Sequence, residues 1–199
     1  MSEAPARRDR RAERHEATRN RILDVAWALA RDRGLAGWSL RDVAVEVGMR
    51  APSLYVYFDS KNALYDAMFA NGYADLLARI EATSTEGRPA EVLHRAAHLS
   101  FDFCVEDPAR YQLLFLRTIP GFTPSAESYT LAQAVIDQLT EVLQAAGAGS
   151  PEQVDLWTAL FTGLASQQIT NDPGGDRWHR LVDLAVDLLI ERQAFVPVT

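Results

Sequence analysis

Residues 39–61 of the chain read SLRDVAVEVGMRAPSLYVYFDSK, and they predict two short helices joined by a tight turn. Apolar side chains in the first half recur at i, i+3, i+4 and i+7, a spacing that places one apolar stripe on a helix; the stripe consists of Leu40, Val43, Ala44 and Val47. Ser39 is a suitable N-cap for this helix, and Gly48 can adopt the left-handed conformation that ends it. Pro52 suits the first turn of the second helix. Since only three residues separate Gly48 from Pro52, the two helices must turn sharply on each other, as in a helix-turn-helix.

The second of these helices carries side chains that suit contact with DNA. In a helix-turn-helix the second helix enters the major groove, and the residues at its start meet the base edges. Ser53 can donate a hydrogen bond to a phosphate or a base, and Tyr55 and Tyr57 each offer a hydroxyl group on a rigid ring. Leu54 and Phe58, four residues apart, would hold the inner face against the domain. An ordinary pair of helices with exposed tyrosines is the alternative interpretation. Arg50 and Lys61 place a positive charge on either side of the helix. We expect the following residues to contact DNA: Ser39, Arg50, Ala51, Pro52, Ser53, Tyr55, Val56, Tyr57 and Lys61.

This stretch and its flanks resemble the N-terminal signature of the TetR family of transcriptional regulators. The resemblance covers about the first third of the chain and is carried by Gly34, Ser39, Val43-Ala44, Gly48, Leu54-Tyr55, Phe58, Ser60-Lys61 and Leu64. Val43 and Met49 stand where the family more often has Ile and Val, and Arg50 replaces a small turn residue, so the operator sequence stays open. The resemblance implies that the C-terminal helices hold a small-molecule effector and that the last two helices pair two subunits.

The composition is that of a globular protein. Of the 199 residues, 48% are hydrophobic and 24% are charged, which is too apolar for disorder. No apolar run approaches the roughly 20 residues of a membrane span, and no apolar segment follows the arginine-rich N-terminus, so we expect no membrane partner and no secretory signal. The single cysteine, Cys104, excludes an intramolecular disulfide and agrees with a reducing, cytoplasmic location.

Charge is distributed unevenly along the chain, whose net charge is −7. Residues 1–62 contain 12 Arg and Lys against 9 Asp and Glu, a net charge of +3, whereas the remainder contains 8 against 18, a net charge of −10. The basic part coincides with the predicted helix-turn-helix. Because phosphates would repel the acidic remainder, we expect it to point away from the duplex.

The pattern predicts an all-α protein in three parts. Residues 1–16 have almost no apolar content and five arginines, so we expect a flexible basic arm that reaches DNA or merely aids solubility. Residues 17–62 form a three-helix DNA-binding domain, whose first helix Gly34 ends. Residues 63–199 form a helical bundle for effector binding and dimerisation. Its helices are expected from Asp59 or Ser60 to about residue 82 and, after the linker 83–89, at about 90–105, 108–118, 126–146, 151–170 and 176–193.

One group of side chains could bind a metal. Glu91, His94 and His98 lie at i, i+3 and i+7 on one predicted helix, but no fourth ligand is near in sequence, and histidines on a helix face are more often packed or solvated. Cys104 lies among apolar residues and is interpreted as an inert buried thiol. We expect no metal, no cofactor and no catalytic residue, because no catalytic motif is recognisable.

Aromatic residues in the second domain suggest a ligand pocket, because pockets between bundle helices are often lined by such side chains. The expected wall residues are Phe101, Tyr111, Phe115 and Trp157, with Gln112, Thr118, Gln167 or Gln168 as polar partners. Wide apolar faces on two helices predict an isologous dimer contact, formed by Trp157, Leu160, Phe161, Leu164, Leu181, Leu184 and Leu188.

Together these features predict a homodimeric transcriptional repressor that a small apolar ligand releases from a palindromic DNA operator. The dimer follows independently of the resemblance, since one short recognition helix buries too little surface for tight specific binding. Two other classes stay open: an all-α metal-dependent enzyme using Glu91, His94 and His98, and a helical interaction module without an effector.

Overall fold

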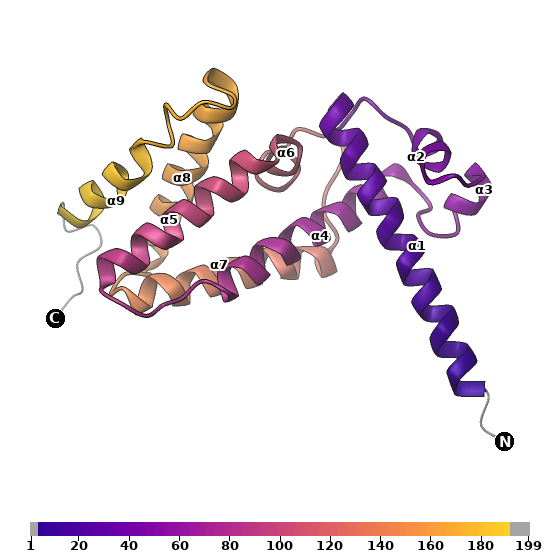
Figure 1. Cartoon of the computed structure of the whole chain (residues 1–199), viewed down its shortest axis with the longest axis horizontal. Helices are drawn as coiled ribbons and strands as arrows, with labels where there is room; N and C mark the ends of the chain where they lie inside the picture. The colour runs from indigo at the N-terminus through magenta and orange to yellow at the C-terminus, as the bar shows by residue number, and fades with distance from the viewer. Residues whose placement is uncertain (1–3, 192–199) are drawn as a thin grey trace. The chain divides into compact units, whose positions relative to one another are not determined.

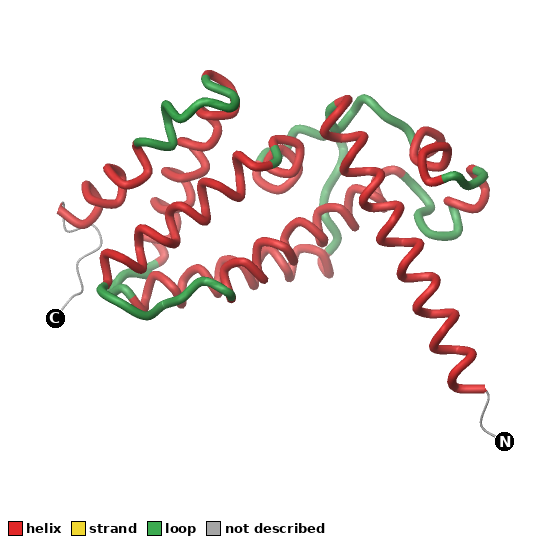
Figure 2. The backbone as a smooth tube through the Cα atoms, viewed as in Figure 1, coloured by secondary structure: helices red, strands yellow, loops and turns green. Residues whose placement is uncertain are grey.

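The computed structural model describes residues 4–191 of the chain, with side chains from residue 10 onward. All regular elements in this range are α-helices (Figures 1 and 2). The described residues divide into two compact units. The first extends to Phe69 and includes the segment Ile119–Pro124, and the second contains Ala70–Thr118 and the residues from Ser125 onward. The predicted all-α fold is confirmed.

The first unit is built from α1 (Ala4–Arg33), α2 (Leu40–Val47), α3 (Ala51–Leu54) and the beginning of α4 (Lys61–Glu81). In Figure 1, α2 and α3 lie beside the C-terminal half of α1. Gly34 has a φ of 73° and ends α1 as predicted. Ser60 caps α4, because its Oγ accepts a hydrogen bond of 3.1 Å from the amide of Ala63.

The start of α1 corrects one prediction. The sequence predicts a flexible arm over residues 1–16, but residues 4–16 continue α1 as regular helix; residues 1–3 lie outside the described part. The physical reason is composition, since Ala, Arg and Glu are strong helix formers. The segment has no apolar stripe, but this reflects the exposure of its described side chains to solvent. Its backbone is nevertheless regular helix.

The predicted helix-turn-helix core is confirmed. All four members of the α2 stripe are buried, namely Leu40, Val43, Ala44 and Val47. Leu54 is fully buried and Phe58 is 3% exposed, so both hold the second helix against the unit. α3 itself ends at Leu54, and the amides of Tyr57 and Phe58 donate to the carbonyl of Leu54 in a further turn.

The second unit contains the rest of α4 together with α5 (Pro89–Glu106), α6 (Pro108–Phe115), α7 (Ala126–Ala145), α8 (Pro151–Asn171) and α9 (Leu181–Glu191). Helix α5 packs against α6, α7, α8 and α9. Asp107 caps α6 by accepting from the amides of Ala109 and Arg110, and Ser150 forms a capping box with Gln153 at the start of α8.

Two boundaries differ from the prediction. The unit boundary lies within α4, after Phe69, rather than between residues 62 and 63; Leu64, Tyr65 and Met68 are buried, so the first turns of α4 belong to the core of the first unit. Helix α9 begins at Leu181 rather than near residue 176. The side chain of Gln168 explains this delay, because its Oε1 accepts from the amides of residues 178 and 179 and holds that segment outside the helix.

Candidate DNA-binding surface and ligand cavity

The turn that precedes α2 is fixed by a reciprocal cap. The amide of Asp42 donates to Oγ of Ser39 at 3.3 Å, while Oδ2 of Asp42 accepts from the amide of Ser39 at 2.7 Å and from its hydroxyl at 2.6 Å. The side-chain hydrogen bond from Ser39, together with the backbone one, lowers the pKa of Asp42. The side chain of Ser39 is exposed, but its hydroxyl already caps α2. Ser39 therefore has a structural role that does not depend on any DNA contact.

The outward face of the second helix combines polar and apolar groups. Gly48, with a φ of 79°, ends α2 and lets the chain enter α3. The side chains exposed beyond it are Arg50, Pro52, Ser53, Tyr55 and Val56, whereas Ala51 and Tyr57 are half-buried. Tyr55 is 54% exposed and Val56 is 74% exposed, although both are large. Leu54, which lies between the exposed Pro52 and Tyr55 in the sequence, is fully buried. The helix therefore has one inner face and one face exposed to a partner.

Helix α1 takes part in this surface. The ring of His15 stacks on the ring of Tyr57, with a centroid distance of 4.6 Å and an interplanar angle of 28°. The guanidinium of Arg19 lies 5.2 Å from the ring centre of Phe58. No sequence pattern indicates these contacts, because residues about 40 positions apart are brought together only by the folded helix-turn-helix.

Lys61 has an internal role that the sequence analysis did not anticipate. Its Nζ donates to the carbonyl of Ala36 at 3.3 Å and to that of Trp38 at 2.5 Å. The ammonium also lies 4.3 Å from the ring centre of Trp38, a favourable cation–π arrangement. Burial lowers the pKa of Lys61, and the charge of Asp42 acts in the opposite direction. Lys61 therefore ties the loop before α2 to the first turn of α4.

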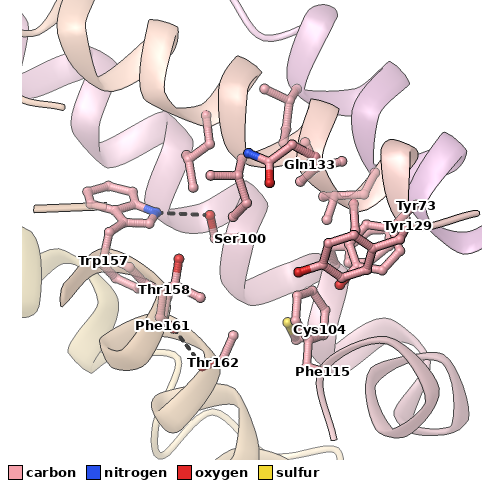
Figure 3. A pocket seen from close by; sticks show the side chains of 17 residues that line it. Tyr73, Ser100, Cys104, Phe115, Tyr129, Gln133, Trp157, Thr158, Phe161 and Thr162 are labelled. Atoms are coloured by element: carbon pink, nitrogen blue, oxygen red, sulfur yellow. Dashed lines mark hydrogen bonds between the residues drawn. The ribbon is translucent and has the colours of Figure 1, made fainter. Parts of the chain in front are cut away.

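The second unit contains a cavity of about 200 Å³ between α4, α5, α6, α7 and α8 (Figure 3). Its walls are mostly apolar, and the residues that line it are Tyr73, Leu76, Ile80, Ser100, Phe103, Cys104, Phe115, Tyr129, Ala132, Gln133, Val135, Ile136, Leu139, Trp157, Thr158, Phe161 and Thr162. Figure 3 shows Trp157 and Phe161 on one side of the space and Tyr73, Tyr129 and Phe115 on the other. Tyr129 is 59% exposed and Ile136 is 37% exposed, so the cavity opens to solvent along α7.

The cavity offers few polar groups and no formal charge. Among the described residues, those that line it include no Asp, Glu, Lys, Arg or His. The indole Nε1 of Trp157 donates to Oγ of Ser100 at 3.2 Å, as Figure 3 shows. Burial raises the pKa of the Tyr73 hydroxyl and of the Cys104 thiol to about 12, so both groups stay neutral at physiological pH. Such a wall suits a neutral ligand.

Two of the four expected wall residues do not line the cavity. Phe115 and Trp157 do, but Phe101 packs edge-on against His179, and the hydroxyl of Tyr111 donates to the carbonyl of Thr162. None of the expected polar partners lines it either, which applies to Gln112, Thr118, Gln167 and Gln168. The residues that α7 contributes to the cavity were not predicted from the sequence. A stripe of Ala132, Val135 and Leu139 on α7 was the available signal, but periodicity does not tell which partner an apolar face meets.

The expected dimer face needs a correction at two positions. Trp157 and Phe161 are each 1% exposed within the single chain, so they have no surface left for a partner, because both point into the cavity region. Leu160, Leu164 and Leu181 are half-buried, whereas Leu184 is 51% exposed and Leu188 is 47% exposed. Leu156 of α8, at 44% exposed, adds to the apolar surface of these two helices.

The possible metal group of Glu91, His94 and His98 is not assembled. Glu91 accepts hydrogen bonds from the backbone and the guanidinium of Arg88 at the start of α5. His94 and His98 instead contact α9, where Oδ1 of Asp183 lies 2.8 Å from Nδ1 of His94 and 2.9 Å from Nε2 of His98.

None of the helices within residues 4–191 combines the length and the apolar character that a membrane-spanning helix needs.

Comparison with known proteins identifies relatives of the N-terminal part most clearly. Residues 22–68 match the family described as bacterial regulatory proteins, tetR family. The chain is 27% identical over 100 residues to the HTH-type transcriptional regulator YobS of Bacillus subtilis, covering 50% of this chain and 52% of that protein. It is 25% identical over 183 residues to Mb1846 of Mycobacterium bovis, with 84% and 75% covered. The repressor KstR2 of Rhodococcus jostii is 33% identical over 69 residues, which are 35% of this chain and 34% of that protein.

The fold is shared with solved structures over nearly the whole chain. The tetR-family transcriptional regulator from Streptomyces coelicolor superposes with a TM-score of 0.70 at 21% identity and covers 91% of this chain and 84% of its own. The second unit thus has the architecture of these proteins although its sequence is only distantly similar.

We expect Lys61→Ala to destabilise the protein. The change removes two hydrogen bonds from a charged donor, each worth about 1.5–3 kcal/mol at most, and solvent screening of the half-buried ammonium reduces this to about 1–2 kcal/mol overall. Urea denaturation followed by tryptophan fluorescence measures the loss. Arg50→Ala is the control, because this exposed cation should change stability by less than about 0.5 kcal/mol. Equal denaturation midpoints for the two variants would show that the Lys61 contacts are not stabilising.

Proposed function

Because this chain belongs to the TetR family of bacterial regulatory proteins, we propose that it is a homodimeric transcriptional repressor released from a palindromic operator by a neutral, largely apolar small molecule. It acts on DNA in the cytoplasm and needs no cofactor. Family membership also argues against the metal-dependent enzyme, because proteins of this family regulate transcription. The cavity in the second unit argues against an interaction module without an effector.

The exposed face of α3 is the observation that carries the DNA-binding proposal. Within α3 and the residues directly before and after it, Leu54 and Phe58 are buried, while Arg50, Ser53 and Tyr55 are exposed. A helix held in this way can enter a major groove with its first residues at the base edges. Arg50 supplies a cation for a phosphate or a guanine edge, and the serine and tyrosine hydroxyls supply donors. Val56, at 74% exposed, can contact a thymine methyl group.

Two features support the proposed dimer, the small size of the DNA-binding helix and the exposed leucines of α8 and α9. A single recognition helix of this size makes few base contacts, whereas two related by a twofold axis can meet successive major grooves about 34–36 Å apart. Leu156, Leu184 and Leu188 leave apolar surface exposed on α8 and α9, and burying it against the same surface of a second copy removes it from water. We therefore propose an isologous interface formed by α8 and α9.

The chemistry of the cavity limits the effector. A formal charge would have to enter a wall without counter-ions, which is costly in a medium of low polarity. The available polar groups are amide and hydroxyl groups, of which Gln133, Thr158 and Ser100 are examples. At about 200 Å³ the cavity is smaller than many drug-sized sites. A compact, uncharged molecule with one or two hydrogen-bonding groups fits these limits best.

Helix α4 provides the proposed coupling, because it contributes residues to both units. Tyr73, Leu76 and Ile80 line the cavity, whereas Leu64 and Tyr65 lie in the core of the first unit. A ligand that favours one position of α4 shifts the equilibrium between DNA-binding and DNA-free states. By linkage, DNA must lower the ligand affinity by the same factor as the ligand lowers the DNA affinity.

The DNA-binding surface can be tested with an operator that the wild-type protein selects from random duplexes. We expect Tyr55→Ala to lower affinity by about tenfold or more, about 1.4 kcal/mol. Arg50→Ala should reduce the salt slope by about 1, the value for a cation that neutralises one phosphate. Fluorescence anisotropy at several salt concentrations measures both. Arg88→Ala is the matched control, since the side chain of Arg88 is 82% exposed but lies in the second unit and outside the cavity. Unchanged affinity and slope in both variants of the α3 region would refute the assignment.

The dimer interface can be tested by charge. Leu184→Glu combined with Leu188→Glu places two carboxylates in the proposed apolar contact, so we expect a monomer in light scattering at micromolar concentration. Leu116→Glu is the control, because Leu116 is 40% exposed outside α8 and α9. If the double variant remains a dimer like the control, the interface lies elsewhere on the chain.

The effector site can be tested by filling the cavity. A thermal-shift screen of neutral apolar compounds should yield a hit that stabilises the wild type, by about 2.7 kcal/mol at a concentration of 100 times its Kd, and releases the operator. Ala132→Leu narrows the cavity and should abolish most of the shift. Ala134→Leu, on the same helix but outside the lining, should retain it. A hit that stabilises Ala132→Leu equally binds elsewhere; a hit that binds at the cavity without releasing DNA excludes the coupling.

A further inference from the structure

Three possible metal ligands meet between α5 and the segment that precedes α9. His98 and Asp102 belong to α5, and His179 lies two residues before the start of α9. One ligand atom of each residue lies within 4.8 Å of those of the other two. Nε2 of His179 is 3.7 Å from Oδ1 of Asp102, and the rings of His98 and His179 are 5.3 Å apart. This group lies outside the cavity and outside the DNA-binding unit.

The local structure holds all three side chains in place. His98 and Asp102 are four residues apart, so one turn of α5 brings them to the same face. The backbone at His179 is held by Gln168, a side chain only 5% exposed, whose Oε1 accepts from the amides of Trp178 and His179 at 2.9 and 3.3 Å. The ring of His179 also packs edge-on against Phe101. The imidazole is therefore presented to α5 by a fixed segment.

Carboxylates surround the two histidines. Oδ1 of Asp183 lies 2.9 Å from Nε2 of His98. Both ring nitrogens of the neighbouring His94 already contact carboxylates, those of Asp183 and Asp187. Three carboxylates, those of Asp102, Asp183 and Asp187, thus lie beside the imidazoles at this contact between α5 and α9, an arrangement that attracts a cation.

We propose that His98, Asp102 and His179 bind one divalent transition-metal ion, with Zn²⁺ as the best match. Two imidazoles and a carboxylate are ligands that Zn²⁺ accepts, and Asp183 or a water can complete the coordination. Zinc–ligand distances of about 2.0–2.2 Å place the ligand atoms of a tetrahedral site about 3.3 Å apart, so small side-chain rotations suffice to close the group. Mg²⁺ and Ca²⁺ prefer shells of oxygen and fit less well.

The ion would connect α5 to the segment between α8 and α9. His179 and Asp102 have 47% and 46% of their side-chain surface exposed, so the site is open to solvent and loads without unfolding. Because the metal binds only the folded arrangement, it stabilises the second unit by mass action. It also fixes the start of α9.

The test uses the full chain, freed of any affinity tag, stripped with a chelator and titrated with Zn²⁺. Calorimetry should give about one Zn²⁺ per chain, and thermal unfolding should shift to higher temperature on addition of Zn²⁺. His98→Ala and His179→Ala should each lower the affinity by at least about tenfold, as even the loss of an outer-shell partner does. Asp102→Asn should do the same while keeping the side-chain shape, and circular dichroism without metal shows whether each variant is folded.

Two matched histidine controls complete the experiment. His15→Ala removes a histidine in the other unit, and His94→Gln removes the histidine one turn before His98 on α5; both should retain one site of wild-type affinity. The proposal is overturned if the wild type binds no Zn²⁺, if Asp102→Asn and His179→Ala bind as tightly as the wild type, or if His94→Gln loses the site as completely as His98→Ala does. Operator binding by the stripped protein tests the proposed function separately, since none of these metal ligands lies in the first unit.

Discussion

The burial of α5 is the constraint on which the second unit depends. This helix packs against α6, α7, α8 and α9, so it must present small or apolar side chains around most of its circumference. The buried ones are Val92, Leu93, Ala96, Ala97, Phe101, Phe103 and Cys104. Two adjacent alanines let neighbouring helices approach closely, while the phenylalanines fill the wider gaps. What remains of the surface of α5 is confined to narrow strips, and those strips carry the chemistry.

These strips separate two kinds of environment on one helix. Ser100, Phe103 and Cys104 face the cavity, whereas His98 and Asp102 lie on the side of α5 near His179, just before α9. The first strip contains no formal charge, because a buried charge without a partner is costly. The second is partly exposed, so charged groups stay solvated there. The same helix would therefore bind a neutral ligand on its cavity side and a metal cation on its exposed side. The uncharged cavity wall disfavours a cation, and the charged, solvated side disfavours an apolar ligand.

Local features of the fold were predictable from the sequence, and long-range ones were not. The cap at Ser39 and the stop at Gly48 depend on neighbouring residues only, and both agree with the structure. The internal contacts of Lys61 involve residues more than 20 positions away in the sequence. From the sequence alone, a lysine at this place is equally consistent with an internal contact and with a contact to a DNA phosphate. Periodicity shows that a helix has an apolar face, not what that face meets.

The same limit explains the candidate sites. Aromatic side chains often line pockets. Of the four chosen for this reason, Phe115 and Trp157 line the cavity, whereas Phe101 and Tyr111 pack elsewhere. The sequence assigns Trp157 to the dimer face as well, but its side chain is only 1% exposed within the single chain and so has little surface for a partner. Which side chains around α3 are exposed was easier to predict, because a turn of fixed length determines which side of the short helix is outward.

Gly72 shows how the cavity is joined to α4. A Cβ at this position would lie 3.0 Å from Cδ1 of Leu114, so any other residue here would require the Leu114 side chain to shift. The next residue, Tyr73, donates its hydroxyl to the carbonyl of Leu114 at 3.1 Å. Phe115, which follows Leu114, lines the cavity, as does Tyr73 itself. A molecule that displaces the ring of Phe115 therefore acts within one residue of the point where α6 is anchored to α4. Because glycine weakens the interior of a helix, α4 is also easiest to bend at this point, three residues beyond the unit boundary at Phe69.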